Sequence, residues 1–290
     1  MIRLVEVGPR DGLQNEARFV PTEVKVAFVD ALSQCGFDEI EVSSFVHPRW
    51  VPQLADAEAV FGSITRRPGI TYMALVPNAA GLERAQAARA DKVAVFTAAS
   101  ETFSRKNSNA SIAQSIERFR PVLAHAGRPV RGYISTAFHC PYEGPIAPAR
   151  VLAVARTLLE LGCDELSLGD TIGKAIPAEV TRLLELLLPE CPPARLALHF
   201  HDTYGQALDN ARAGLAMGIT TFDSSAGGIG GCPYAPGAPG NVATEALVAG
   251  FAGQTAIDAE RLAAASAIVR PYLTPPREPG RGHAAIFPAP

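Results

Sequence analysis

Eight short apolar segments recur along this chain of 290 residues, and the stretches between them have the apolar spacing of surface helices. We expect the eight segments to be β-strands, at residues 2–7, 39–43, 70–76, 92–97, 131–137, 165–168, 196–200 and 221–225. Strands that alternate with helices usually pair in parallel, and eight of them can close into a barrel. The sequence therefore predicts an α/β protein with a (β/α)8 or TIM barrel fold.

The segments between the strands carry helix signals. At residues 21–34 and 148–161 the apolar side chains fall on one face, with a proline in the first turn and a glycine near the end. An open doubly wound sheet is the alternative, but it would normally place a Gly-x-Gly-x-x-Gly turn after its first strand. Here that turn reads Gly8-Pro9-Arg10-Asp11-Gly12, which favours the barrel.

We expect one catalytic domain at residues 1–269, followed by a proline-rich C-terminal extension at residues 270–290. The extension has little periodicity, so it is either an ordered wrap belonging to the same domain or a loose tail. The chain contains no internal repeat and no linker long enough to divide it.

Charge and cysteine content narrow the class of protein. The 26 basic and 29 acidic side chains give a formal charge of −3 without a basic run that could follow a phosphate backbone, so we expect no nucleic-acid partner. The N-terminal segment is too polar for a signal peptide and no later stretch could span a bilayer, so we expect a cytoplasmic protein without a membrane partner. The five cysteines are scattered and lack a C-x-x-C pair, which indicates free thiols.

Polar residues follow the predicted strands at their C-terminal ends, where a β/α barrel places its active site. A glycine-rich stretch at residues 227–231 comes after the last strand. We expect these residues to meet at one mouth of the barrel: Arg10, Asp11, Glu41, Ser43, His139, Asp170, Thr171, His199, His201, Asp202, Cys232 and Asn241.

The strongest local signal is the pair His199 and His201. Residues two apart in a strand share a face, so both imidazoles point the same way. Asp11 would bring an anion to them, and such a nitrogen and oxygen set suits magnesium, manganese or another transition ion. The alternatives are two interior histidines hydrogen-bonded to carboxylates, and an Arg10–Asp11 ion pair or turn cap.

Three further features have two interpretations each. Glu41 could form a structural ion pair, or could hold the guanidinium of Arg10 across adjacent strands. Cys232 could transfer a proton from a closing glycine-rich loop, or could be inert in a flexible or phosphate-gripping loop. Arg105 and Lys106 could be solvated loop charges or could meet the phosphates of a nucleotide.

Taken together, these residues belong to long motifs that resemble the 3-hydroxy-3-methylglutaryl-CoA (HMG-CoA) lyase family. The likeness runs from Glu6 to about Leu247. The motifs stand here as Glu6-Val7-Gly8-Pro9-Arg10-Asp11-Gly12-Leu13-Gln14-Asn15-Glu16, Ser44-Phe45-Val46, Trp50-Val51-Pro52-Gln53, Cys140-Pro141-Tyr142-Glu143-Gly144, Leu168-Gly169-Asp170-Thr171-Ile172-Gly173, His201-Asp202-Thr203-Tyr204-Gly205-Gln206-Ala207 and Gly230-Gly231-Cys232-Pro233-Tyr234.

The resemblance implies a carbon–carbon lyase that cleaves HMG-CoA to acetyl-CoA and acetoacetate. It implies a divalent cation, Mg²⁺ or Mn²⁺, as the cofactor, with no organic cofactor beyond the CoA of the substrate. The implied metal ligands are Asp11, His199, His201 and Asn241. Arg10 would stabilise the enolate, Cys232 would act at the reacting centre, and Glu41 would lie near the metal. We also expect Asp170 to be catalytic, and the substrate-binding residues to be Gln14, Ser43, His139 and Thr171.

Two departures from the family pattern concern the acyl pocket. His139 and His47 stand where smaller residues are common, so a related 3-hydroxy-3-methyl acyl-CoA is an alternative substrate. A second alternative is a Claisen-type synthase of the same superfamily, which usually shows His-x-His-Asn-Asp where this chain reads His199-Phe200-His201-Asp202-Thr203. A barrel that only binds a metal or a CoA ester is the third. The expected partner is a small acyl-CoA, and a homo-oligomer is possible.

Overall fold

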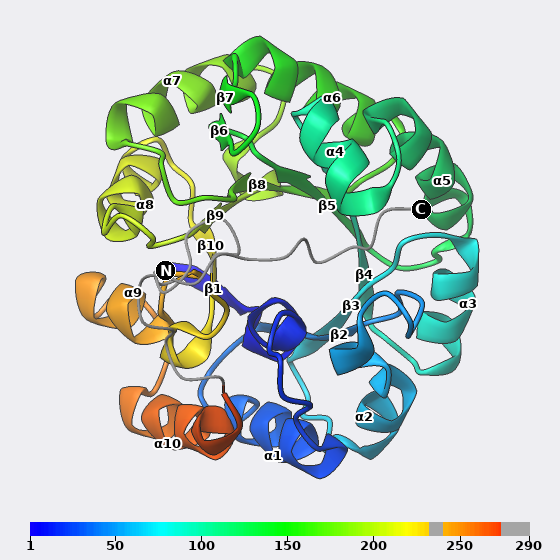
Figure 1. Cartoon of the computed structure of the whole chain (residues 1–290). Coiled ribbons are helices and arrows are strands. Elements are labelled where there is room, and N and C mark those ends of the chain that lie inside the picture. The colour runs from blue at the N-terminus through cyan, green and yellow to red at the C-terminus, as the bar shows by residue number, and fades with distance from the viewer. Residues whose placement is uncertain (232–239, 274–290) are drawn as a thin grey trace.

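A computed structural model of the chain describes residues 1–231 and 240–273, and it forms a closed barrel of parallel strands inside a ring of helices (Figure 1). The strands follow the order β1-β10-β9-β8-β5-β4-β3-β2, and β1 pairs with both β10 and β2. This closure confirms the barrel and excludes the open sheet. The barrel strands are β1 (Arg3–Glu6), β2 (Glu39–Ser44), β3 (Thr71–Leu75), β4 (Lys92–Ala98), β5 (Val130–Ser135), β8 (Glu165–Asp170), β9 (Leu196–Phe200) and β10 (Thr221–Ser224).

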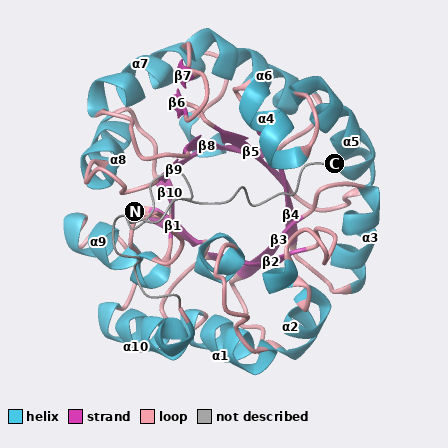
Figure 2. Cartoon of the chain, in the orientation of Figure 1, coloured by secondary structure: helices cyan, strands magenta, loops and turns pink. Residues whose placement is uncertain are grey.

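Helices surround the barrel on all sides (Figure 2). They bury an outer core against the strands, in which Phe28, Leu158 and Leu184 are fully buried. None of the helices in the described residues is long and apolar enough to cross a membrane. The helices are α1 (Thr22–Leu32), α2 (Ala57–Ser63), α3 (Ala79–Ala87), α4 (Glu101–Ser108), α5 (Ile112–His125), α6 (Pro148–Glu160), α7 (Pro177–Leu187), α8 (Ala207–Ala216), α9 (Thr244–Gly250) and α10 (Ala259–Val269).

The predicted helices at residues 21–34 and 148–161 correspond to α1 and α6. Five short helical turns complete the described structure. They are η1 (Gly8–Gly12), η2 (Pro52–Leu54), η3 (Pro193–Arg195), η4 (Ala226–Gly228) and η5 (Arg270–Tyr272).

The inside of the barrel is divided between apolar and charged side chains. A small apolar cluster contains Val5, Met73 and Ala94, which come from three different strands. Charged residues at the beginnings of several strands fill the remaining interior, and Glu39 and Lys92 form an ion pair there at 2.9 Å. Side chains thus fill the barrel at the N-terminal ends of its strands, and a ligand would enter at the C-terminal ends.

One segment departs from the expected strand pattern. The strand predicted at residues 131–137 ends at Ser135, because Thr136 adopts a positive φ of 54° and turns the chain away from the barrel. The chain then forms a small antiparallel hairpin of β6 (His139–Cys140) and β7 (Gly144–Pro145). This hairpin moves His139 away from the end of β5, where the sequence pattern had placed it.

Two expectations fall partly outside the described residues. Cys35, Cys140, Cys163 and Cys191 are buried free thiols, whereas Cys232 lies outside the residues that the structure describes. Of the predicted proline-rich extension at residues 270–290, only the turn η5 and Leu273 are described, so the division at residue 269 stays a prediction.

Candidate active site

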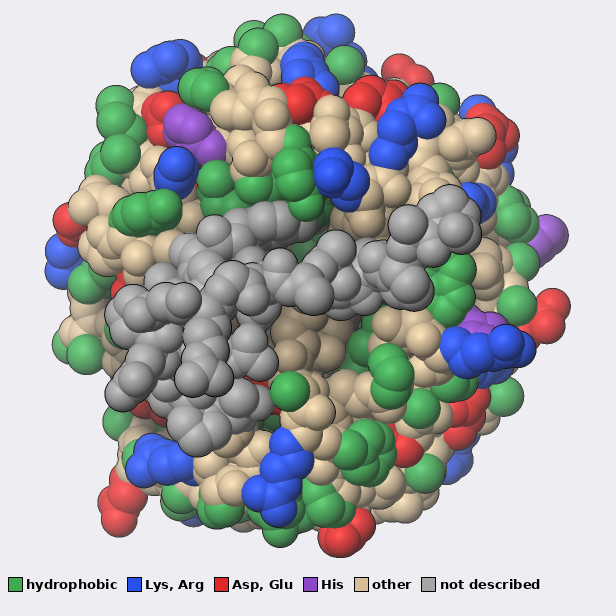
Figure 3. Space-filling model, in the orientation of Figure 1, with side chains coloured by type: hydrophobic (Ala, Val, Ile, Leu, Met, Phe, Trp, Pro, Cys, Tyr) green, Lys and Arg blue, Asp and Glu red, His purple; other side chains and the backbone are tan. Residues whose placement is uncertain are grey.

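A cavity of 1230 Å³ opens at the C-terminal ends of the barrel strands. The space-filling view shows the molecule hollowed near the barrel axis on this face (Figure 3). The walls of the cavity include many of the residues expected to meet there, namely Arg10, Asp11, Gln14, Thr171, His199, His201 and Asn241. The structure therefore brings these residues, with the expected substrate-binding residue Gln14, to one mouth of the barrel.

The turn after β1 brings Arg10 and Asp11 to the mouth. The backbone N–H groups of Arg10, Asp11 and Gly12 all donate to the carbonyl of Val7, which gives the wide π-type turn η1. Such wide turns are frequent at functional sites because they reorient consecutive side chains.

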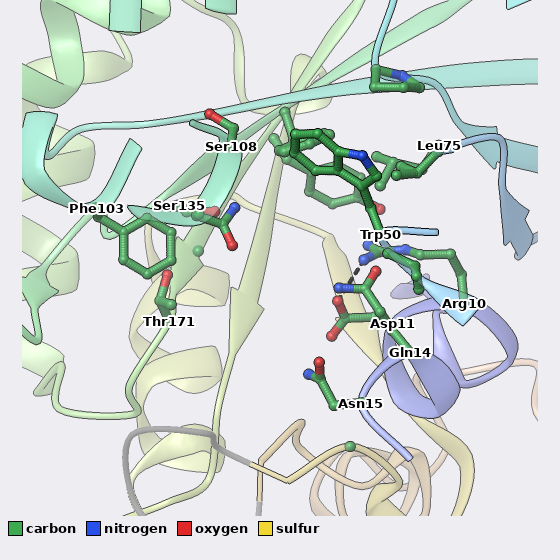
Figure 4. A pocket seen from close by; sticks show the side chains of 18 of the residues that line it. Arg10, Asp11, Gln14, Asn15, Trp50, Leu75, Phe103, Ser108, Ser135 and Thr171 are labelled. Carbon is green, nitrogen blue, oxygen red and sulfur yellow. Dashed lines mark hydrogen bonds and ion pairs between the residues drawn. The ribbon is translucent and has the colours of Figure 1, made fainter. Parts of the chain in front are cut away.

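Figure 4 shows how these side chains face the cavity. Arg10, Asp11 and Gln14 come from one wall of the cavity, and Ser135 and Thr171 come from the opposite wall. The turn η1 therefore presents its polar side chains across the mouth to the ends of β5 and β8.

Three side chains meet in a group that could hold a metal ion. One ligand atom each of Asp11, His199 and His201 lies within 4.8 Å of the others. The two imidazole rings are 5.4 Å apart, as expected for alternate residues of one strand. Asn241 joins the group, because its Nδ2 donates to Asp11 Oδ2 at 2.9 Å.

The chemistry of this group fits a divalent cation. In the described part of the chain, His201 Nδ1 and Asn241 Oδ1 are buried without a hydrogen-bond partner, and unpartnered buried polar atoms are costly without a ligand. Burial and the neighbouring His199 lower the pKa of His201 to about 4. Burial opposes the charge of Asp11, but Arg10 and the two histidines still hold its pKa below the usual range. Both residues are therefore ready to act as ligands at neutral pH.

His199 fits the alternative interpretation of the histidine pair, in which interior histidines are hydrogen-bonded to carboxylates. Its Nδ1 lies 3.3 Å from Asp223 Oδ2, at the same register level of the adjacent strand. Burial favours the neutral ring, but the hydrogen bond to Asp223 and the charge of Asp11 raise the pKa of His199 above its usual value. A carboxylate behind the imidazole is also the common arrangement around metal-ligating histidines, so this bond supports both interpretations.

Arg10 is held from two sides. Its Nε donates to Glu41 Oε2 at 2.7 Å, and its Nη1 donates to Asp11 Oδ1 at 2.5 Å. The pair between Arg10 and Glu41 is thus present, as both interpretations of Glu41 expect. Burial alone would favour the neutral guanidinium, but Glu41 and Asp11 keep the pKa of Arg10 above its usual value.

Sequence reasoning missed Tyr133, which completes the support of Arg10. Its ring lies 5.5 Å from the Arg10 guanidinium, and its hydroxyl donates to Glu41 Oε2 at 3.2 Å. The available signal was its position, because Tyr133 is an aromatic residue on the inward face of β5, two residues before the strand ends. The mouth of the barrel thus contains a fixed cation next to the candidate metal group.

Three predicted site residues do not join this group. The carboxylate of Asp170 accepts the backbone N–H groups of Lys174 and Ala175 at 3.1 and 3.0 Å, and burial raises its pKa to about 6. His139 lies on the hairpin, where its Nε2 is 3.0 Å from Glu179 Oε2 of α7. Neither side chain is on the cavity wall.

Ser43 is displaced by a β-bulge. The register shifts between Glu41 and Ser43, so Glu41 pairs with Met73 of the inner cluster, but Ser43 pairs with Ala74 of the outer core. A one-residue shift moves a side chain to the other face of a strand. This explains why simple alternation grouped Ser43 with Glu41, whereas only Glu41 contacts Arg10.

Two residues with open interpretations line the cavity. His47, one of the two departures from the family pattern, is on its wall. Lys106 lines it as well, with its ammonium 4.6 Å from the centre of the Tyr142 ring, whereas Arg105 is 65% exposed. Of the two departures from the family pattern, His47 thus lies on the cavity wall and His139 does not.

Comparisons with known proteins identify the family of the chain and agree with its fold. The HMGL-like family model matches residues 1–269. The rat cytoplasmic 3-hydroxy-3-methylglutaryl-CoA lyase is 54% identical over 85% of this chain and 73% of its own length. A Pseudomonas aeruginosa 3-hydroxy-3-isohexenylglutaryl-CoA/hydroxy-methylglutaryl-CoA lyase is 56% identical over 84% of this chain and 82% of its own length.

A solved structure gives the same result. The HMG-CoA lyase from Acinetobacter baumannii, in complex with coenzyme A and 3-methylmalate, superposes with a TM-score of 0.89 and 38% identity over 94% of this chain and 91% of its own. The chain belongs to the HMG-CoA lyase family and is a carbon–carbon lyase.

Proposed function

We propose that this chain cleaves HMG-CoA to acetoacetate and acetyl-CoA with the help of Mg²⁺ or Mn²⁺. The observation that carries this proposal is the meeting of Asp11, His199 and His201 beside a buried, doubly anchored Arg10. The chemistry needs both, because one partner must favour the loss of a proton from a tertiary alcohol and another must accept the charge of a thioester enolate. Neither anion is stable in water at neutral pH.

We assign the cation to Asp11, His199, His201 and Asn241. The support is the short distance between the three titratable ligands and the free Oδ1 of Asn241. When bound, a divalent cation supplies Lewis acidity, which lowers the pKa of the substrate's tertiary hydroxyl. The chain holds these ligands on three separate segments, so the site forms only when the barrel is closed.

Arg10 stabilises the negative charge that develops on the thioester oxygen as the carbon–carbon bond breaks. Glu41 and Tyr133 fix the direction of the guanidinium before the reaction, so little reorganisation is needed at that moment. A preorganised donor of this kind contributes about 3 kcal/mol to the transition state. Glu41 acts here by orienting Arg10.

The enolate carbon then takes a proton to become the methyl group of acetyl-CoA. We propose Cys232, or a water that it positions, as the donor; Cys232 lies outside the described residues. The support is its place after Gly230, whose φ of 105° and close approach to Gly12 leave no room for a side chain. The glycine-rich segment thus packs directly on the turn that carries Arg10.

For substrate binding we retain Gln14 and Thr171, which lie on the cavity wall, and add His47 as a determinant of the acyl pocket. We assign Asp170 to holding the loop after β8, because backbone N–H groups occupy its carboxylate. His139 and Ser43 support the hairpin and the β2 bulge instead of the substrate.

The test is an assay of acetoacetate with chelator-treated protein and HMG-CoA. We expect no product without a cation, and restored product with Mg²⁺ or Mn²⁺. Calcium, which prefers more oxygen ligands at longer distances, serves as the control cation. Product formation that ignores the metal would contradict the proposal, and so would its absence with every cation.

A second acyl substrate is favoured by the shape of the site. The cavity has a wall of large apolar side chains, among them Leu75, Phe96 and Phe119, which suits a longer apolar acyl chain. The Pseudomonas aeruginosa relative is named for two acyl chains, one of them the longer isohexenyl group. We therefore propose that this chain accepts 3-hydroxy-3-isohexenylglutaryl-CoA more slowly than HMG-CoA, which paired assays would test.

The remaining proposals concern the binding partner, the cellular compartment and the oligomeric state. We propose that the partner in solution is an acyl-CoA and that the protein works in the cytoplasm, as the name of the rat relative says of that protein. Size-exclusion chromatography with light scattering would determine whether it forms a homo-oligomer.

A further inference from the structure

Asp223 lies on β10 beside His199, away from the cavity wall, and its carboxylate contacts three polar side chains. Its Oδ2 accepts from Ser167 Oγ at 2.8 Å and lies 3.3 Å from His199 Nδ1. Its Oδ1 forms an ion pair with Arg131 Nη2 at 2.8 Å. Asp223 is 1% exposed and is not on the cavity wall, so it cannot touch a substrate.

We propose that Asp223 is a positioning residue for His199, and that Arg131 and Ser167 hold Asp223 in place for this task. The proposal deepens the assignment of His199 as a metal ligand and rests on it. A carboxylate that accepts Nδ1–H fixes the tautomer of the imidazole, leaving the Nε2 lone pair to face a cation. It also fixes the plane of the ring and raises its basicity as a ligand.

The strand register makes this contact specific. Asp223 and His199 occupy the same level of β10 and β9, and Ser167 lies on β8 in register with Ala197. Side chains at such positions project inward from neighbouring strands, so the carboxylate meets the histidine without a bend in either backbone. Ser167 adds a donor that keeps Oδ2 directed at the ring.

Arg131 connects this contact with the other arm of the site. The Arg131 guanidinium lies 5.1 Å from the centre of the Tyr133 ring. The hydroxyl of Tyr133 donates to the carboxylate of Glu41. Glu41 in turn anchors Arg10 at 2.7 Å. One buried cation below the mouth therefore supports both the metal ligand and the enolate-binding guanidinium.

A purely structural role for Asp223 makes a different prediction. In that case its carboxylate only neutralises Arg131, as Glu39 neutralises Lys92 at 2.9 Å in the same barrel. Glu39 is 3% exposed, and the ion pairs that it forms are with Lys92 and Arg3, away from the histidines. Glu39→Gln is thus a matched control, because it also exchanges one buried carboxylate for an amide of the same shape.

The experiment measures Mn²⁺ binding to each protein without substrate, by the loss of the free-ion electron paramagnetic resonance signal. We expect Asp223→Asn to bind Mn²⁺ about 10–100-fold more weakly than the wild type, the usual cost of losing such a partner of a metal ligand. Glu39→Gln should bind Mn²⁺ as tightly as the wild type, since its carboxylate does not contact a ligand. Circular dichroism and denaturant unfolding verify that each variant is folded.

Equal weakening in both variants, or wild-type affinity in Asp223→Asn, would overturn the proposal. If Asp223→Asn does not fold, Ser167→Ala leaves every charge in place and removes only the hydrogen bond to Oδ2. We expect it to weaken Mn²⁺ binding about threefold, consistent with the loss of one hydrogen bond, and unchanged affinity would contradict the proposal.

The outcome is separable from that of the lyase assay. Wild-type protein that binds Mn²⁺ but forms no acetoacetate would contradict the proposed reaction and leave the role of Asp223 standing. Wild-type protein that binds no Mn²⁺ would overturn both.

Discussion

Two groups of charged and polar side chains lie inside the same barrel, and they differ in whether their buried polar atoms face an opposite charge. The mouth cluster lies at the C-terminal ends of the strands and consists of Arg10, Asp11, Glu41, His199, His201 and Asn241. The lower network lies toward the other end of the barrel and consists of Arg3, Glu39, Lys92, Arg131, Glu165 and Asp223.

The lower network is balanced. Each of its charged groups lies within 3.4 Å of an opposite charge. Both groups contain buried atoms without a hydrogen-bond partner in the described part of the chain. In the lower network these atoms are Glu39 Oε1, Arg131 Nε and Nη2 and Asp223 Oδ1, and each lies within 3.4 Å of an opposite charge. In the mouth cluster they are Glu41 Oε1, His201 Nδ1 and Asn241 Oδ1, and no ion pair of the described residues includes them. Since burying an unpartnered polar atom is unfavourable, such atoms identify the place where a ligand completes the protein.

The comparison is tested most strongly by Arg10→Gln. We expect kcat to fall about 10²–10³-fold, as when one preorganised donor to a developing anion is removed, with a much smaller change in KM. Steady-state kinetics with HMG-CoA would measure this, with Arg105→Gln as the control because Arg105 is 65% exposed. If instead KM rises and kcat does not change, Arg10 contributes only to ordinary substrate binding.

The lower network is tested by Lys92→Met. This change removes the ammonium group that lies 2.9 Å from Glu39 and 2.6 Å from Glu165, and leaves Arg3 as the other cation paired with both. We expect the free energy of unfolding to fall by about 3 kcal/mol, the typical cost of breaking a buried ion pair from one side. Denaturant unfolding measures the loss, and Mn²⁺ affinity should not change. A variant with wild-type stability would show that the network is not structural.

Glu6 is a third kind of buried carboxyl, held by hydrogen-bond donors. It accepts from the backbone N–H groups of Gly8 and Ala226 at 2.8 and 2.9 Å and from the Thr244 hydroxyl at 2.9 Å, which ties together three segments around the mouth. Burial raises the pKa of Glu6 to about 8, although these donors oppose the change.

This raised pKa gives a pH dependence of known sign. Between about pH 4.5 and 8 the folded state retains a proton that the unfolded state releases, so the free energy of unfolding falls as the pH rises. We expect the wild type to lose about 2 kcal/mol between pH 5 and 7 relative to Glu6→Gln, which cannot titrate. Denaturant unfolding of both proteins at the two pH values measures this difference. If the free energy of unfolding of both proteins changes equally between pH 5 and 7, Glu6 is ionised in the folded protein.

The smallest effect is expected for a charge pair outside the barrel. Arg120 and Glu117 of α5 form an ion pair at 2.9 Å, but their side chains are 56% and 63% exposed. Arg120→Met should change the free energy of unfolding by about 0.5 kcal/mol or less, since water and salt screen exposed pairs. A loss close to that of Lys92→Met would show that burial does not explain the difference between the two networks.

Much of the site could be predicted because it lies at strand ends. Arg10, Asp11, His199 and His201 follow or end apolar strands, so barrel geometry brings them together whatever the details of the helices. Ser43 and His139 could not be placed in this way, because a bulge and a positive φ at Thr136 change the direction of a side chain or of the chain itself.

The partners of the site were harder to predict than the site. Asp223 and Arg131 were visible as charged residues in apolar strands, but their sequence positions are far apart and either could have paired elsewhere. Only the register of β10 with β9 places Asp223 beside His199. Cys232 remains a prediction, since it lies outside the described residues.

The sequence by itself determined the barrel, the residue types of the candidate metal group and the family, because strand periodicity and residue type are local properties. The tertiary structure alone decided which buried charges are neutralised and which are left for a ligand. That distinction depends on distances of 3 to 4 Å between residues on different strands, and closure of the barrel sets those distances.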